Sequence, residues 1–320
     1  MARLLPTVCK GVPSMPSLRA RLVELALPLL GVKRFFSEPE RMDARIAKMR
    51  QKPSPRPRGK WHREFDIVEE EQDGFPVVHM TPKGGAKSGG LHLLYLHGGG
   101  YVMDIAAIHW EAVGHLCAAT GASASVALYP LAPEAKAAET VAGVEALFAR
   151  LAERHGPGNI AILGDSAGAG MALALAQRLA GEGAGKPAAL VLYSPWLDAT
   201  ASDEGQAPIE PKDRMLAIAG LKACGSRYAG DLPLTDPRLS PLFGPLDGLP
   251  PIAIFAGTHD ILLPDARRLV EKLTALGAKP LYREYEKMFH DWMLFPIPEG
   301  REALDETAAF LINLRGGSAA

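Results

Sequence analysis

Residues 160–171 read Ile-Ala-Ile-Leu-Gly-Asp-Ser-Ala-Gly-Ala-Gly-Met, and the architecture of the chain can be argued outward from them. The apolar run 160–163 predicts a short buried strand, and residues 168–179 predict a helix. Between them Gly164–Gly168 forms G-x-S-x-G, a sharp strand-to-helix turn that needs small residues around its serine. A glycine-rich turn before a helix can also be purely structural. In this context we predict that Ser166 is a nucleophile at a helix N-terminus.

Short apolar segments alternate with amphipathic segments on both sides of this turn. The expected strands are 65–68, 76–80, 91–96, 123–128, 160–163, 189–193, 252–255 and 279–285. The expected helices are 108–119, 134–155, 168–179, 265–276 and 302–314. This alternation indicates the α/β class, with a mostly parallel sheet covered by helices on both faces.

Two segments depart from the alternation. Residues 198–249 are rich in Pro, Gly and Asp, with one expected helix near 212–228, and such insertions often carry specificity. Residues 1–60 are rich in Arg, Lys, Met and Pro, and they end in an extended linker at 53–59. We therefore expect a body over residues 61–314 and a tail at 315–320.

The N-terminal segment raises the question of targeting. Residues 22–30 are largely apolar and follow Arg19 and Arg21, which outlines a signal peptide. Glu24 interrupts the run, however, and no small-x-small cleavage site follows. We therefore expect an amphipathic helix that packs on the body, and a second one over residues 40–50.

Composition narrows the classes of function. Hydrophobic residues make up 48% of the 320 residues and charged residues 22%, which argues against disorder. A net charge of -1 gives no basic field for nucleic acid, and no stretch reaches the length of a membrane span. Cys9, Cys117 and Cys224 are an odd number without a CxxC pair, which favours a reducing, cytoplasmic location.

A second glycine-rich motif, His97–Tyr101, follows the expected strand 91–96. Three consecutive glycines lose much backbone entropy on folding, which is explained if their N–H groups must approach a ligand closely. An oxyanion hole has this requirement, with the Ala167 N–H as a further donor. The alternatives are a plain flexible turn, and His97 acting as the general base rather than orienting the loop.

A nucleophilic serine needs a base and an orienting carboxylate, and on such strand–turn–helix scaffolds both follow it in the order acid, histidine. Asp260 lies just beyond the expected strand 252–255, and His290 lies in the loop after the last expected strand. Asp198 remains a rival for the acid and His259 a rival for the base. We predict the triad Ser166, Asp260 and His290.

Metal and nucleotide chemistry find no support in the sequence. H-E-x-x-H and CxxC are absent, and Gly168–Gly170 is a fragment of a dinucleotide fingerprint without a clear ribose-binding acid. We therefore expect no metal and no cofactor.

Together, these motifs resemble the hormone-sensitive-lipase family of bacterial esterases in the α/β-hydrolase superfamily. The motifs that carry the resemblance are His97–Tyr101, Tyr129–Glu134, Gly164–Gly168, Asp236–Pro241 and Phe289–Trp292. The match covers about residues 61–314, and so many motifs in the same order are highly specific. The resemblance implies Ser166, Asp260 and His290 as the triad. It also implies Gly98, Gly99 and Ala167 as oxyanion donors.

The resemblance also implies an α/β-hydrolase fold with a helical cap, built from residues 1–60 and about 198–230. The implied activity is cofactor-independent hydrolysis of short- to medium-chain acyl esters, with a small-molecule ester as partner and a possible homodimer. Amide deacetylation and lactone hydrolysis use the same triad. A non-catalytic small-molecule receptor is the alternative of another class, and the presence of His290 argues against it.

A finite pocket under a cap predicts an optimum of acyl length between roughly C4 and C8, because each buried methylene adds affinity until the pocket is full. We expect little activity on emulsified triglyceride, because the sequence shows no large lipid-facing patch. The expected pocket walls are apolar residues in otherwise polar neighbourhoods: Leu27, Leu30, Phe35, Phe36, Met42, Met215 and Leu216.

Overall fold

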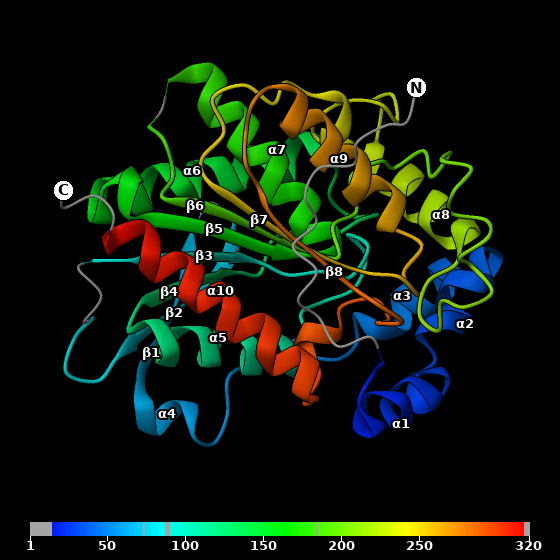
Figure 1. Ribbon diagram of the computed structural model, residues 1–320, viewed down its shortest axis with the longest axis horizontal. Coiled ribbons are helices and arrows are strands. Elements are labelled where there is room, and N and C mark those ends of the chain that lie inside the picture. The colour runs from blue at the N-terminus through cyan, green and yellow to red at the C-terminus, as the bar shows by residue number, and fades with distance from the viewer. Residues whose placement is uncertain (1–14, 73, 87–89, 184, 317–320) are drawn as a thin grey trace.

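The protein is described from a computed structural model that covers residues 15–72, 74–86, 90–183 and 185–316. These residues form a sheet of eight strands in the order β1-β2-β4-β3-β5-β6-β7-β8 (Figure 1). The pairs β1–β2 and β2–β4 are antiparallel, and all other neighbours are parallel. The strands are β1 Phe65–Gln72, β2 Phe75–Pro82, β3 His92–Leu96, β4 Ser123–Ala127, β5 Ile160–Asp165, β6 Ala189–Tyr193, β7 Ile252–Gly257 and β8 Leu281–Tyr285.

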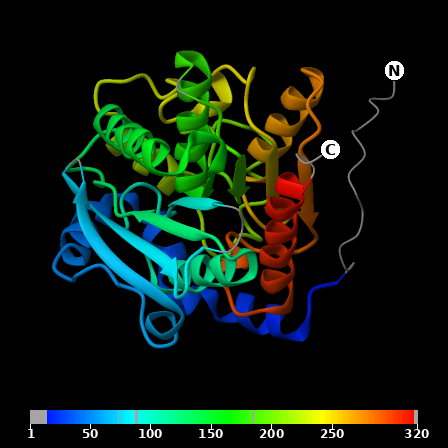
Figure 2. The ribbon, with the colours of Figure 1, turned by 90° about the vertical axis from the view of Figure 1, so that its left-hand side faces the viewer.

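Helices cover both faces of this sheet, as the alternation predicted. One face carries α5 and α10, and the other carries α6, α7 and α9 (Figures 1 and 2). Every residue of the inner strands β3, β5, β6 and β7 is buried, which explains why they are apolar runs. The helices of the body are α4 Trp61–Glu64, α5 Ala107–Thr120, α6 Ala137–His155, α7 Ser166–Glu182, α9 Leu263–Ala275 and α10 Pro298–Gly316.

The two outer strands carry charged side chains. In β1, residues 69–71 are three consecutive exposed glutamates. In β8, Arg283 pairs with Glu306, and Glu284 accepts a hydrogen bond from Arg267 at 2.9 Å. Both edge strands of the sheet, β1 and β8, therefore carry charged side chains.

The N-terminal segment and the insertion lie against each other. The N-terminal elements are α1 Leu18–Ala26, η1 Leu27–Leu30, α2 Val32–Ser37, η2 Pro39–Arg41 and α3 Met42–Met49. The insertion contributes α8 Ile218–Ala229, whose Gly220 lies so close to Phe36 that an added Cβ would be 2.4 Å from the Phe36 Cα. Residues 53–58, within the expected linker 53–59, form neither helix nor strand.

Several element boundaries differ from the sequence prediction. The helix of the insertion begins at Ile218 rather than near residue 212, because the Asp213 carboxylate accepts the N–H groups of Met215 and Leu216 and holds a turn there. The C-terminal helix α10 includes residues 315 and 316, which we had assigned to the tail.

Helix α1 differs most from expectation. We define the leucine stripe as Leu18, Leu22 and Leu25, which lie on one face and are 72%, 58% and 74% exposed. The helix packs on the body through its other face, which contributes the buried Ala20. Leu29 and Leu30 extend the exposed surface. The exposure of these leucines was not predicted from the sequence.

Two further expectations concern the cysteines and the presence of a membrane span. Cys117 and Cys224 are buried free cysteines, and Cys9 lies outside the described residues. No helix within the described ranges is both long and apolar enough to cross a membrane.

Candidate active site

The backbone between β5 and α7 turns as sharply as the motif predicts. Ser166 has φ 50°, a left-handed conformation that is unfavourable for any residue except glycine. A Cβ on Gly164 would lie 2.4 Å from the Gly168 carbonyl carbon, and one on Gly168 would lie 2.0 Å from the Leu96 oxygen. Glycine is therefore required at residues 164 and 168, two positions before and two positions after the serine.

Three side chains from distant parts of the chain meet at this turn. The Ser166 Oγ lies 3.0 Å from the His290 Nε2, and the His290 Nδ1 lies 2.8 Å from the Asp260 Oδ2. Asp260 follows β7 and His290 follows β8, so both come from the same carboxyl edge of the parallel strands as Ser166. All three residues are buried.

The rival residues lie elsewhere. The His259 Nδ1 is 2.8 Å from the Glu24 Oε1 of α1, and Asp198 binds Thr200 and Arg268. The His97 Nδ1 is 2.7 Å from the Gly98 oxygen, and burial lowers the pKa of His97 to about 4. The structure brings none of these three side chains into contact with Ser166.

A second carboxylate contacts the imidazole of His290. The Asp291 Oδ2 lies 3.1 Å from the His290 Nε2, on the side that faces Ser166. Burial lowers the pKa of His290, but Asp260 and Asp291 together outweigh it and hold this pKa well above its ordinary value. Burial also raises the pKa of Asp291 to about 7, against the opposing effect of His290.

The glycine loop differs from the sequence prediction at one position. The Gly98 N–H donates to the Asp165 Oδ2 at 2.9 Å, so this donor is already used, and the assignment of Gly98 as an oxyanion donor is wrong. Gly99 and Gly100 have φ 123° and 61° and line the cavity above Ser166. Among the described residues, neither of their N–H groups has an acceptor. The Ala167 N–H, in the first turn of α7, is also available.

Asp165 holds the glycine loop, residues 97–101, in place through Gly98. It is fully buried, accepts the Tyr95 hydroxyl at 2.6 Å and lies 3.2 Å from the His109 Nε2. Burial raises the pKa of this carboxyl, but His109 and the hydrogen bonds outweigh burial and lower it. The pKa of His109 is raised correspondingly, because Asp165 outweighs the burial of the imidazole. The glycine loop is therefore held by the buried Asp165 carboxyl group, which contacts His109.

A cavity of about 140 Å³ lies over Ser166. Of the seven wall residues expected from the sequence, Phe36, Met215 and Leu216 line it, together with Val32. The others do not line it: Leu27, Phe35 and Met42 are packed in the core, and Leu30 is 61% exposed. The remaining apolar walls are Met103, Ala106, Ile108, Leu294 and Phe295.

Asp213 connects the insertion to the triad. Its Oδ2 accepts the N–H of Ile261, next to Asp260, at 3.0 Å, and its Oδ1 holds the backbone of the wall residues Met215 and Leu216. Burial, reinforced by repulsion from Asp260, raises the pKa of Asp213 to about 6. One carboxyl group therefore positions both a pocket wall and the loop of the acid.

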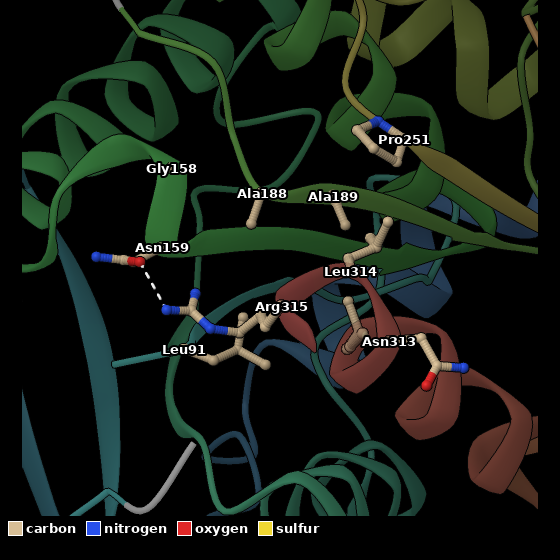
Figure 3. Close-up of a pocket in the computed structure, with 10 residues that line it drawn as sticks. Leu91, Gly158, Asn159, Ala188, Ala189, Pro251, Asn313, Leu314 and Arg315 are labelled. Carbon is tan, nitrogen blue, oxygen red and sulfur yellow. Dashed lines mark hydrogen bonds between the residues drawn. The ribbon is translucent and has the colours of Figure 1, made fainter. Parts of the chain in front are cut away.

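A larger cavity of about 590 Å³ lies at the other edge of the sheet (Figure 3). Asn159, Ala188 and Pro251 line it, each just before β5, β6 or β7. It is therefore separated from Ser166 by the length of the strands. Within the described ranges, no three His, Cys, Asp or Glu side chains are arranged to hold a metal ion.

The structure brings the predicted serine, acid and histidine into contact, but Asp291, His109 and Asp213 beside them were not predicted from the sequence. In the sequence analysis, Asp291 is only part of the motif Phe289–Trp292. Its adjacency to the base was a usable signal, because a carboxylate next to a catalytic imidazole changes its pKa. His109 and Asp213 carry no comparable local signal.

The fold and the Ser–His–Asp geometry define the chain as an α/β hydrolase. Residues 93–294 match the family described as alpha/beta hydrolase fold. An acetyl-hydrolase of Streptomyces hygroscopicus is 34% identical over 72% of this chain and 78% of its own length.

Solved structures give the same result. A crystal structure of EstE5 matches with a TM-score of 0.80 and 26% identity, over 94% of this chain and 99% of that one. An esterase described as bacterial hormone-sensitive lipase family matches with a TM-score of 0.74 and 28% identity, over 87% and 98%. The chain belongs to the hormone-sensitive-lipase family and is a serine carboxylesterase.

Proposed function

We propose that Ser166, His290 and Asp260 hydrolyse carboxylic esters through an acyl-enzyme. The Ser166 Oγ attacks the ester carbonyl while the His290 Nε2 takes its proton, and Asp260 stabilises the imidazolium that forms. His290 then protonates the leaving alcohol, and water releases the acid by the reverse sequence. The observation that carries this proposal is the continuous contact from Ser166 through His290 to Asp260 at 3.0 and 2.8 Å.

The oxyanion of the tetrahedral intermediate would be bound by the N–H groups of Gly99, Gly100 and Ala167. Gly99 and Ala167 are kept from the sequence prediction, and Gly100 takes the place of Gly98, whose N–H donates to Asp165. Gly99 and Gly100 lie beside Ser166 in the wall of the cavity, and Ala167 contributes the dipole of α7. Such preorganised donors contribute most to catalysis where water is excluded.

The acyl group would be short. The cavity of about 140 Å³ corresponds to roughly five water molecules in the liquid, which favours the lower end of the C4 to C8 range. We propose that residues 1–60 and 198–230 form the cap, because Val32 and Phe36 of the first segment and Met215 and Leu216 of the second line the cavity. The acetyl-hydrolase relative supports a small acyl group.

An active-site label and one substitution test the proposal. An organophosphate should modify Ser166, identified by mass spectrometry of the labelled peptide. Ser166→Ala should lower kcat on a short acyl ester by about 10⁴- to 10⁶-fold with an unchanged circular dichroism spectrum. The matched control Ser226→Ala changes an exposed serine of α8 and should keep both labelling and activity. Retention of more than about a tenth of kcat in Ser166→Ala would contradict the role of Ser166.

A substrate screen separates ester hydrolysis from its alternatives. Esters, amides and lactones would all acylate Ser166, a lactone giving a hydroxyacyl-enzyme, so the label cannot distinguish them and a screen of acetyl esters, acetamides and lactones would rank them by kcat/KM. A receptor would bind ligand without turnover. We expect the ester to rank first.

A further inference from the structure

The leucine stripe of α1 is an apolar surface that the described part of the chain leaves uncovered. Leu18, Leu22 and Leu25 lie on successive turns of one face, and Leu29, 89% exposed, continues the line into η1. The inward face of the helix contributes the small Ala20. Three large apolar side chains of α1, the leucines, therefore point to solvent, and only the partly buried Val23 packs on the core beside Ala20. A helix that packs only on its own body would carry polar residues at the positions of these leucines.

Positive charge borders the stripe on both sides. At 100° per residue, Arg19 and Arg21 fall on opposite edges of the face that carries the leucines. Arg21 bonds to the neutral Pro16 oxygen, and no carboxylate in the described ranges pairs with Arg19. Residues 15–36 carry four Lys or Arg and one acid, Glu24, although the whole chain has a net charge of -1.

The body holds α1 firmly in this orientation. Ser17, at the start of α1, donates from its N–H and its hydroxyl to the Glu299 carboxylate at 2.5 and 3.0 Å. Glu24, the acid on this segment, is engaged by the His259 Nδ1 at 2.8 Å. Figures 1 and 2 both show α1 at the lower border of the molecule. The stripe is therefore presented on an anchored helix.

The surroundings of the stripe connect it to the active site. The chain continues from η1 into α2, whose Val32 and Phe36 line the cavity over Ser166. Arg19 also lines a cavity of about 510 Å³, together with Arg301 and apolar residues of the loop 293–297. Leu294 belongs to the walls of both cavities. A partner bound to α1 would thus lie beside the wall of the acyl pocket.

We propose that the leucine stripe docks the enzyme on an anionic phospholipid surface. An apolar face bordered by arginines matches such an interface, where leucines enter the acyl region and the basic groups meet phosphate. A second copy of this chain fits less well, because stripe-to-stripe pairing would oppose arginine with arginine at both borders. The proposal does not depend on the roles proposed for Ser166, His290 and Asp260.

Co-sedimentation of the full chain with vesicles tests the proposal. The vesicles are pure phosphatidylcholine, or phosphatidylcholine mixed with phosphatidylglycerol. We expect the chain to sediment with the anionic vesicles, and salt to weaken this binding. The triple variant Leu18→Ser, Leu22→Ser, Leu25→Ser should bind at least about tenfold more weakly. Arg19→Gln with Arg21→Gln should lose about tenfold on the anionic vesicles alone.

A control replaces three other exposed apolar residues: Val68→Ser, Leu276→Ser and Ile312→Ser, at 53%, 54% and 47% exposure. It should bind as the wild type does. All variants should hydrolyse a short acyl ester without vesicles at the wild-type rate, which shows that they are folded. If the wild type itself did not hydrolyse the ester, this result would count against the proposed triad and not against docking.

Four outcomes would overturn the proposal. In the first, the wild type stays in the supernatant with anionic vesicles. In the second, the control variant loses as much binding as the stripe variant. In the third, light scattering shows a dimer that only the stripe variant dissociates, which assigns the face to a second copy. In the fourth, deletion of residues 1–14 raises vesicle binding about tenfold or more, which assigns the face to that segment.

Discussion

His290, the proposed base, lies between two carboxylates. Asp260 contacts one ring nitrogen and Asp291 the other, at 2.8 and 3.1 Å. The base must be neutral to accept the Ser166 proton, and a raised pKa keeps it protonated to higher pH. The rise of kcat/KM with pH should therefore lie above the ordinary histidine range near 6.5.

Asp291→Asn should move this rise to lower pH. The amide keeps the shape of the side chain but removes one negative charge, so the pKa of His290 falls and more of the base is neutral at pH 7. The measurement is the pH profile of kcat/KM on a short acyl ester. Asp104→Asn is the control, because Asp104 lines the same cavity without a contact to His290. Equal profiles for wild type and Asp291→Asn would show that Asp291 does not set the pKa of the base.

The two candidate bases can be separated directly. His290→Ala should reduce kcat by about 10⁴-fold or more, because no other described imidazole lies against the Ser166 Oγ. His259→Ala should keep most of the activity, since that side chain binds Glu24 of α1. Steady-state kinetics of both variants decide the matter, and a greater loss in His259→Ala would reverse the assignment.

For single residues, the sequence predicts which side chains meet at the site better than it predicts which backbone N–H groups point into it. The positions after β5, β7 and β8 identify Ser166, Asp260 and His290, because the carboxyl ends of parallel strands share one edge. The error at Gly98 arose because three consecutive glycines look alike in sequence. Which N–H faces the substrate depends on the buried Asp165, whose contact with Gly98 is formed only in the fold.

At the scale of elements, the alternation of apolar strands and amphipathic helices predicted the sheet and its two helical layers. Strand β1 extends to Gln72, which pairs with Phe75 of β2, beyond the expected end at residue 68. The glutamates 69–71 are not typical strand residues, so the sequence did not predict this extension. The face that α1 presents was not predicted, because periodicity shows that an apolar stripe exists and not whether the body covers it.

The contact between α2 and α8 gives a test at this scale. Gly220→Ala should lower the free energy of unfolding by about 1–3 kcal/mol, because its new methyl group would meet the backbone of Phe36. Gly181→Ala is the matched helical control. A Cβ at residue 181 meets nothing within 4 Å, so this change should raise stability by about 0.4–1 kcal/mol. Urea unfolding midpoints measure both, and equal shifts would contradict tight packing at Gly220.

For the whole molecule, residues 15–49 are as much part of the core as of the proposed cap. Phe35, Phe36, Met42 and Ile46 belong to the same buried cluster as α6, α7 and α9. Phe36 also lines the cavity over Ser166. The N-terminal segment should therefore affect both stability and acyl selectivity.

Deletion of residues 1–50 should flatten the dependence of kcat/KM on acyl length and cause aggregation, because it removes one wall of the cavity and uncovers the cluster. An acyl series from C2 to C16 and light scattering measure the two effects. Deletion of residues 1–14 is the control for the length of the chain and should preserve the profile. An unchanged profile after deletion of residues 1–50 would show that this segment does not form the pocket.

The charged borders of the sheet have a consequence for handling the protein. An outer strand is a template for a neighbouring chain unless charge or cover prevents it. The exposed glutamates 69–71 of β1 and the ion-paired Arg283 of β8 provide that charge. These charges disfavour strand-to-strand association of neighbouring chains in concentrated stocks. Replacement of the three glutamates of β1 by neutral residues would open that border to such association.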